Sequence, residues 1–217
     1  MTIRDGWLQG DQVSHYQTPN VYKLGQPLES RVTVLHLTAG PIEDAHNWWM
    51  SRASGVCAHV AILEDGSVRQ YSSFRDRLAH VGVGWHPRHG WWPNNFSIGV
   101  ELVNPGWLTI RDGHYYNWRG TQYSGAGVFE AQHPIDHTTW GWVPITPAQW
   151  AAGIEICRLL NAPEIMGHDQ LSSRQIRQRA YDEGIWHELK PPKLDPGPAI
   201  DMEAFLDEVD VARVEVP

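Results

Sequence analysis

The 217 residues are enough for one domain with a sizeable core, and 41% hydrophobic with 19% charged residues is typical of a globular chain, not a disordered one. A formal net charge of −8, without any run of lysine and arginine, argues against nucleic acid as a partner. The N-terminus lacks a charged segment followed by an apolar run, and no stretch approaches the ~18 apolar residues of a membrane helix, so we expect a cytoplasmic protein without membrane insertion.

Five segments of the chain are predicted to form strands. They are residues 31–37, 58–63, 67–71, 96–103 and 164–166. The segment Glu64-Asp65-Gly66 is the strongest hairpin signal in the chain and joins the second and third of them. Gly99 in the fourth would let another part of the protein approach the backbone closely. The fifth is a short strand or an extended link that leads to His168.

Four segments are predicted to form helices: 42–53, a segment starting at Pro147, 172–181 and 201–209. Thr146 is suited to cap the second helix, with Gln149 returning the bond of a capping box. Residues 1–30 are polar and rich in turns, and we expect an N-terminal arm packed against the domain. The aromatic, glycine-rich stretch 104–145 is interpreted as an inserted hairpin and loop. These elements predict a single mixed α/β domain.

Three places in the chain carry residues suited to a metal site. His36 lies in an apolar strand, His168 follows a glycine, and Lys193 and Asp195 flank one apolar residue before a rigid turn. Two neutral imidazoles, one carboxylate and a water are the usual ligands of a catalytic zinc. However, a single strand histidine is more often a core residue than a ligand, the spacing matches no local zinc motif, and Cys57 is an alternative ligand. The residues alone therefore leave the metal site a hypothesis.

Glu101 is a carboxylate within the apolar run 96–103. Burying such a group without a partner costs several kcal/mol. It could face solvent at the end of its strand or pair with an arginine. The alternative is a general base beside a metal-bound water.

Six separated blocks follow one another in the order seen in a known family. They are VLHLTAG (34–40), AHVAILEDGSVRQY (58–71), LAHVG (78–82), NFSIGVEL (95–102), GHDQLS (167–172) and KLDPGPAID (193–201). The chain resembles the zinc N-acetylmuramoyl-L-alanine amidases, which include phage endolysins, peptidoglycan recognition proteins and cytoplasmic anhydro-muropeptide amidases. The resemblance covers about residues 30 to 201. It implies a central mixed β-sheet flanked by helices, with a zinc site at one face of the sheet.

The resemblance also implies a role for each site residue. His36, His168 and Asp195 correspond to the ligands of Zn²⁺, which would acidify a bound water and polarise the amide carbonyl. Glu101 corresponds to the group that takes the proton from this water and passes it to the leaving amine. Lys193 would stabilise the developing oxyanion. The bond that would be cleaved joins the lactyl group of N-acetylmuramic acid to the L-alanine of the stem peptide.

Substrate contacts are predicted less directly. His80 matches the cleft histidine of the family, and we expect His80, Trp85 and Asn95 to contact the substrate. Trp85, Trp91, Trp92 and the aromatic residues of the insert could stack on sugar rings or simply pack the loops.

The sequence departs from the family at three places. Ala58 stands where some members have a tyrosine, the stretch 173–192 is longer than usual, and the insert 104–145 exceeds that of the minimal members. We expect 173–192 to form a lid or a wall of the cleft. The predicted organisation is an arm at 1–30, an amidase domain at 31–210 with inserts at about 104–145 and 173–192, and a C-terminal tail at 211–217.

The expected function is zinc-dependent hydrolysis of this amide bond in peptidoglycan or soluble muropeptides, as a recycling enzyme or as a phage lysin that another agent releases to the wall. A second hypothesis is a module that binds muropeptides without cleaving them, although inactive members typically lose a zinc ligand and none is lost here. A third is a zinc amidase that acts on another amide.

Overall fold

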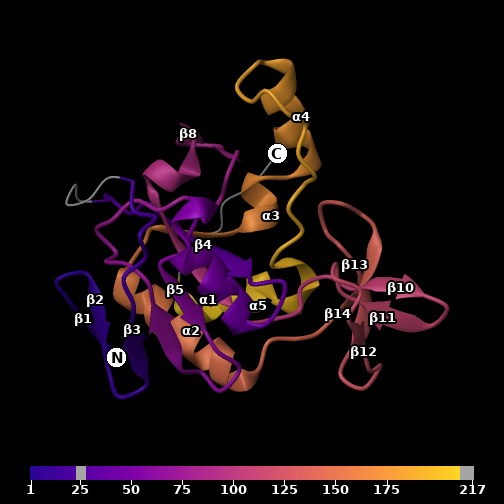
Figure 1. Ribbon diagram of the computed structural model, residues 1–217, viewed down its shortest axis with the longest axis horizontal. Coiled ribbons are helices and arrows are strands. Elements are labelled where there is room, and N and C mark those ends of the chain that lie inside the picture. Colours follow the sequence, from indigo (N-terminus) through magenta and orange to yellow (C-terminus); the bar gives the residue numbers. More distant parts are fainter. Residues whose placement is uncertain (23–27, 211–217) are drawn as a thin grey trace.

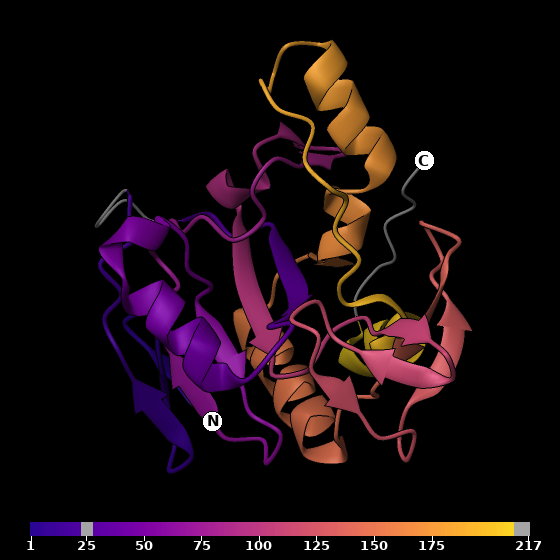
Figure 2. The ribbon, with the colours of Figure 1, turned by 45° about the vertical axis from the view of Figure 1, so that its right-hand side comes forward.

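A six-stranded mixed sheet forms the centre of the computed structural model, which describes residues 1–22 and 28–210 (Figures 1 and 2). The predicted tail at 211–217 lies outside the described residues. In chain order the strands are β3 (Val13–His15), β4 (Val32–Leu37), β5 (Val60–Ile62), β6 (Val68–Gln70), β9 (Ser97–Leu102) and β15 (Glu164–Gly167).

The spatial order of the strands is β15-β4-β9-β5-β6-β3. The first four of these run parallel, β6 is antiparallel to β5, and β3 is parallel to β6. The mixed sheet and the hairpin at Glu64-Asp65-Gly66 are thus confirmed. Part of the predicted N-terminal arm, β3, supplies one edge of this sheet.

Helix α1 (Ile42–Met50) lies on one face of the sheet, and α2 (Pro147–Leu160) and α5 (Met202–Val209) lie on the other. The short α3 (His168–Leu171) follows β15, and α4 (Arg174–Asp182) projects beyond the sheet (Figure 2). There are 3₁₀ turns at Arg52–Ser54, Pro93–Asn95 and Gly197–Ala199. The predicted capping box is present, because the Thr146 hydroxyl accepts from the Gln149 N–H at 3.1 Å and the Gln149 side chain accepts from the Thr146 N–H at 3.0 Å. No helix within 1–22 or 28–210 has the length and apolar character needed to cross a membrane.

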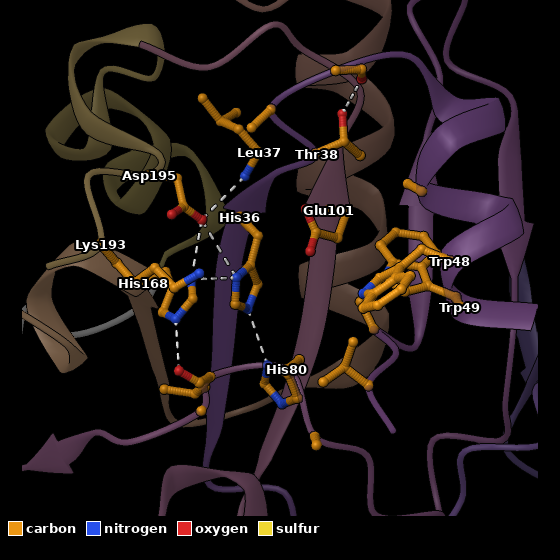
Figure 3. Close-up of a pocket in the computed structure, with 18 of the residues that line it drawn as sticks. His36, Leu37, Thr38, Trp48, Trp49, His80, Glu101, His168, Lys193 and Asp195 are labelled. Carbon is orange, nitrogen blue, oxygen red and sulfur yellow. Dashed lines mark hydrogen bonds and ion pairs between the residues drawn. The ribbon is translucent and has the colours of Figure 1, made fainter. Parts of the chain in front are cut away.

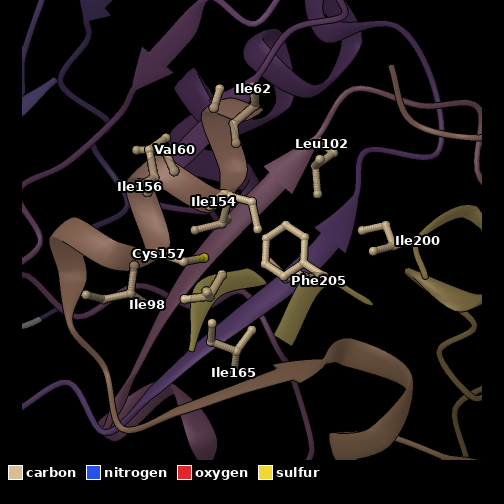
Figure 4. Packing of buried hydrophobic residues seen from close by; sticks show 14 of the residues in the cluster. Val60, Ile62, Ile98, Leu102, Ile154, Ile156, Cys157, Ile165, Ile200 and Phe205 are labelled. Atoms are coloured by element: carbon tan, nitrogen blue, oxygen red, sulfur yellow. The ribbon is translucent and has the colours of Figure 1, made fainter. Parts of the chain in front are cut away.

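The alternation of side chains along β4 and β9 separates the core from the opposite face. Leu35 of β4 and Leu102 of β9 belong to the main hydrophobic core, which includes Ile154 of α2 and Phe205 of α5 (Figure 4). His36 and Glu101, each one position away from these leucines, therefore point to the other face, where α1 lies. That face carries the polar groups of the candidate site.

Smaller sheets surround the central one. They are the hairpins β1 (Thr2–Arg4) with β2 (Trp7–Gln9) and β7 (Trp85–His86) with β8 (Gly90–Trp91), the three-stranded sheet β10 (Thr109–Arg111), β11 (His114–Tyr116) and β12 (Gln122–Tyr123), and the pair β13 (Phe129–Gln132) with β14 (Thr139–Trp142). The last two sheets form the predicted insert, and Figure 1 shows them to one side of the central sheet.

Candidate active site

A pocket of about 920 Å³ lies on the face of the sheet opposite the main core. His36 and Glu101 are neighbours in the β4–β9 register, and His168 follows β15 directly. Parallel strands bring these residues to one edge of the sheet. The walls come from α1, from the insert, and from the segment after α3; they include Trp48, Trp49, Trp107, Trp118, Arg119, Arg177, Trp186, Lys190 and Lys193.

Three side chains converge at the bottom of this pocket (Figure 3). The Nδ1 atoms of His36 and His168 are 2.9 Å apart, and the Asp195 Oδ2 lies 3.1 Å from the His168 Nδ1 and 3.5 Å from the His36 Nδ1. Ligand atoms around a tetrahedral zinc, at bond lengths of about 2.0–2.2 Å, are separated by about 3.3 Å. The three residues that the resemblance implies as ligands are therefore brought together at the spacing a small metal ion needs.

The hydrogen bonds of the Nε2 atoms of His36 and His168 decide which ring nitrogen carries the proton, and so leave a lone pair on each Nδ1. The His168 Nε2 is 2.9 Å from the Val81 carbonyl, which can only accept, so this nitrogen carries the proton and the Nδ1 is unprotonated in the neutral ring. The His36 Nε2 lies 3.0 Å from the His80 Nδ1, and the His80 Nε2 lies 3.3 Å from the Ser97 carbonyl. The same reasoning places the proton of His80 on its Nε2 and that of His36 on its Nε2.

Two nitrogen lone pairs and a carboxylate oxygen thus face one another without a proton between them. Such a group of acceptors is unfavourable unless a cation lies among them. The burial of His36 and the neighbouring His168 lower the pKa of His36 to about 4, which keeps the ring neutral at pH 7. The residues present therefore fit a metal ion, which His36, His168 and Asp195 would hold.

Glu101 lies beside this group, on the same face as its register partner His36. One of its carboxylate oxygens, Oε2, is buried and has no hydrogen-bond partner among the described residues. Burial first, and the negative charge of Asp195 second, raise the pKa of Glu101 to about 8, while Lys193 opposes this shift. No arginine pairs with Glu101 within the described part of the chain, so it fits neither of the two structural roles considered for it.

Lys193 and Asp195 reach the same pocket from one extended segment, as their spacing predicts. The backbone of this segment is held at both residues, because the Lys193 N–H donates to the Ser172 carbonyl at 3.0 Å and the Asp195 carbonyl accepts from the Asp169 N–H at 2.8 Å. The charge of Lys193 lowers the pKa of both His36 and Glu101, so it acts directly on the site.

The predicted substrate residues differ in position. His80 lines the pocket, whereas Trp85 and Asn95 are not among the residues that line it. The Trp85 ring instead lies under the guanidinium of Arg179, at 5.3 Å, and Asn95 ends a 3₁₀ turn. Sequence reasoning missed Trp48 and Arg177. Their only signals were the Trp48-Trp49 pair of the predicted helix and the basic composition of the 172–181 helix.

A second group of potential ligands consists of His86, His89 and Glu164. The His86 Nδ1 accepts from the N–H groups of Arg88 and His89 at 3.1 and 3.2 Å, so the ring proton lies on the Nε2, which is 2.9 Å from Glu164. The guanidinium of Arg88 is 3.1 Å from the same carboxylate. The ring of His86 and the guanidinium of Arg88 both lie against the Glu164 carboxylate, and we assign this group to holding the β7–β8 hairpin against β15.

The fold is shared with known amidases. The structure of a selenomethionine AmpD derivative has a TM-score of 0.59 and 19% identity, over 98% of this chain and 100% of that chain. AmiD from E. coli has a TM-score of 0.56 and 18% identity over 88% of this chain, and AmpDh3 from Pseudomonas aeruginosa has 0.54 and 19% over 88%. The chain spans 61% of the AmiD chain and 63% of the AmpDh3 chain. No curated protein matches the sequence.

At 18–19% identity, these structures show only that the fold is shared. A match to a family model identifies the chain more directly. The model described as N-acetylmuramoyl-L-alanine amidase matches residues 26–198. This range contains His36, Glu101, His168, Lys193 and Asp195, all of which meet in the pocket. The chain therefore belongs to the N-acetylmuramoyl-L-alanine amidase family.

Proposed function

We propose that the chain is a zinc amidase that hydrolyses the bond between N-acetylmuramic acid and L-alanine in muropeptides or peptidoglycan. The observation that carries the proposal is the convergence of the His36, His168 and Asp195 acceptor atoms, within 3.5 Å of one another, beside the half-buried Glu101. Family membership indicates the class of reaction, and the pocket contains the side chains that this reaction needs.

Zinc is the metal that best suits this donor set. Two imidazoles and one carboxylate with an open position are the usual protein ligands of a catalytic zinc, whereas magnesium and calcium favour oxygen ligands. When bound, the ion would supply Lewis-acid chemistry, which polarises an amide carbonyl and acidifies water.

Glu101 is the general base and acid of the proposal. Its carboxylate, which lines the pocket, takes the proton of the attacking water and then delivers it to the amine nitrogen as the amide bond breaks. A raised pKa suits both steps, because the carboxyl must bind the proton and give it up within one turnover. Lys193 places a positive charge near the carbonyl oxygen and stabilises the negative charge that develops there.

The walls of the pocket suit a ligand that is part sugar and part peptide. Trp48 on α1 and Trp118 on the insert are 55% and 61% exposed. The Arg119 guanidinium lies over the Trp118 ring, 4.7 Å from its centroid, so a sugar could stack on Trp48 or on the other face of Trp118. Trp118 is held in place because its ring N–H donates to the Ala39 carbonyl at 2.8 Å. Related structures contain such ligands: AmiD is in complex with anhydro-N-acetylmuramic acid-L-Ala-D-γ-Glu-L-Lys and AmpDh3 with an anhydromuramic pentapeptide.

The test combines metal analysis with a release assay. The purified protein should contain about one zinc per chain and should release peptide with a free L-alanine amine from anhydro-muropeptides or sacculi. Chelation should abolish release and added zinc should restore it. His168→Ala should lose both metal and activity, whereas His114→Ala, at an exposed position of the insert, should lose neither. A zinc-loaded protein that binds muropeptides but leaves them intact would instead indicate a binding module.

A further inference from the structure

Arg177 is a buried cation in the wall of the pocket. It lies on α4, in the stretch 173–192 that is longer than the family usually has, and its side chain is only 7% exposed. Its Nε donates to the Ser172 hydroxyl at 2.9 Å. The two terminal amino groups of the guanidinium have no hydrogen-bond partner in residues 1–22 and 28–210.

Arg177 and Lys193 are both hydrogen-bonded to Ser172. Ser172 is fully buried, and its hydroxyl donates to the Val83 carbonyl at 2.5 Å, so that its oxygen is free to accept from Arg177. The Ser172 carbonyl accepts from the Lys193 N–H at 3.0 Å. One buried serine, four positions after the metal ligand His168, thus anchors both cationic residues.

The other cations of the pocket are already neutralised. Arg119 pairs with Asp44, and Lys190 pairs with Glu188 at 2.6 Å. Among the described residues that line the pocket, Arg177 and Lys193 therefore have no ion-pair partner. A guanidinium stays charged at neutral pH. Burial lowers the pKa of Arg177, and the charge of Asp195 offsets this only in part, without a direct ion pair. A partly desolvated cation in the pocket wall without a paired anion suits a ligand that supplies the negative charge.

A guanidinium with two free amino groups is suited to a carboxylate, which it binds through two parallel hydrogen bonds. The muropeptide named in the AmiD complex contains D-glutamate linked through its γ-carboxyl group, so its α-carboxylate is free. This carboxylate follows the L-alanine at the scissile bond and is the first negative charge on the peptide side.

Building on the proposed function, we propose that Arg177 is a specificity-determining residue that binds the free α-carboxylate of the second stem-peptide residue. The amidase should therefore prefer stem peptides with D-γ-glutamate to those in which this carboxylate is an amide. Lys193 remains assigned to the reacting carbonyl, and Arg177 binds the next residue of the stem peptide, the D-glutamate.

The experiment compares two substrates that differ only at this group: anhydro-N-acetylmuramyl-L-Ala-D-γ-Glu-L-Lys and its D-isoglutamine counterpart. The zinc-loaded wild-type protein should have a kcat/KM about 10- to 100-fold higher on the acidic substrate, mainly through KM, as expected for a hydrogen-bonded ion pair. Arg177→Gln should bring the ratio of the two values close to one, and Arg177→Lys should retain part of it.

The matched control is Arg179→Gln. Arg179 lies on the same helix but outside the pocket, where it pairs with Glu183, so its loss should leave the ratio unchanged. Competition by the free peptides provides a measurement without any variant: L-Ala-D-γ-Glu-L-Lys should inhibit the wild type more strongly than L-Ala-D-isoglutaminyl-L-Lys.

Three results would overturn the inference. They are equal wild-type rates on both substrates, equal inhibition by both peptides, and an Arg177→Gln variant that slows both substrates by the same factor. Failure of the wild type to cleave either substrate would instead contradict the proposed function itself.

Discussion

His36 and His80 are joined by a hydrogen bond of 3.0 Å between the Nε2 of the first and the Nδ1 of the second. Because the outer nitrogen of His80 faces the Ser97 carbonyl, His80 accepts from His36 and the inner nitrogen of His36 is left with its lone pair. His80 was expected to touch the substrate. Its contacts also give it a positioning role toward His36, the proposed metal ligand.

Replacing His80 by alanine should therefore weaken metal binding. Loss of such a supporting hydrogen bond typically lowers metal affinity by about 10- to 100-fold. Zinc affinity can be measured by competition with a chromogenic chelator. His114→Ala, at an exposed position of the insert, is the control and should leave the affinity unchanged. An unaltered affinity in His80→Ala would show that His36 needs no support.

Gly99 allows His80 to reach this position. A Cβ atom at residue 99 would lie 2.8 Å from the Cγ and Nδ1 of the His80 ring, which confirms the close approach expected at this glycine. Gly99→Ala should displace the ring, lower the free energy of unfolding by about 1–3 kcal/mol and weaken zinc binding.

Thermal unfolding and chelator competition would check both effects of Gly99→Ala. Gly125→Ala is the comparison, because the nearest atom to its added Cβ, the Tyr115 Cε2, is at an ordinary 3.6 Å. If the two variants behave alike, the contact between residue 99 and His80 has no consequence.

Glu101→Gln keeps the shape of the side chain and removes its ability to take a proton. We expect kcat to fall by at least about 100-fold, the usual contribution of a general base, while the zinc content stays unchanged. Steady-state kinetics together with metal analysis would check this. Glu130→Gln, on the exposed strand β13, should leave both quantities as they are. Turnover that survives in Glu101→Gln would remove Glu101 from the mechanism.

Elements with a local chemical signal could be predicted from the sequence. The strand 31–37, the Asp65-Gly66 hairpin and the capping box at Thr146 each depend on neighbouring residues, and all three are confirmed. The proposed metal ligands His36, His168 and Asp195 were predicted from the resemblance that the six sequence blocks carry. The parallel register that pairs His36 with Glu101 has no local signal.

Other features depend on distant pairings that no sequence pattern reports. The short polar strand β3 joins the sheet edge beside β6. Trp118 reaches the pocket because the insert folds back until its ring N–H meets the Ala39 carbonyl. The stretch 173–192 was expected to form a lid or a wall of the cleft, but the basic composition of α4 gave no sign that Arg177 in particular would be buried. Trp85 and Asn95 lie near His80 and Glu101 in sequence, yet the pocket is lined by other residues.

Acid should destabilise the fold through His59. This histidine is fully buried, its Nδ1 accepts from the Gly99 N–H at 3.0 Å, and its Nε2 donates to the Asp76 carbonyl at 3.1 Å. The ring is therefore neutral, and burial lowers its pKa from 6.5 to about 4. Between these values the unfolded chain binds a proton that the folded chain does not, so stability falls as the pH drops from about 6.5 towards 4.

The loss attributable to this single group is about 3 kcal/mol when complete, and about 2 kcal/mol of it is reached at pH 5. Urea unfolding of the zinc-loaded protein at pH 7.5 and pH 5 would measure it. His59→Gln should be less stable at pH 7.5 but should lose less stability on acidification, and the difference from the wild type removes the contribution of the other histidines. His114→Gln, which is exposed, should follow the wild type. If His59→Gln has the same pH dependence as the wild type, the buried ring is protonated in the folded state and the assignment of its hydrogen bonds is wrong.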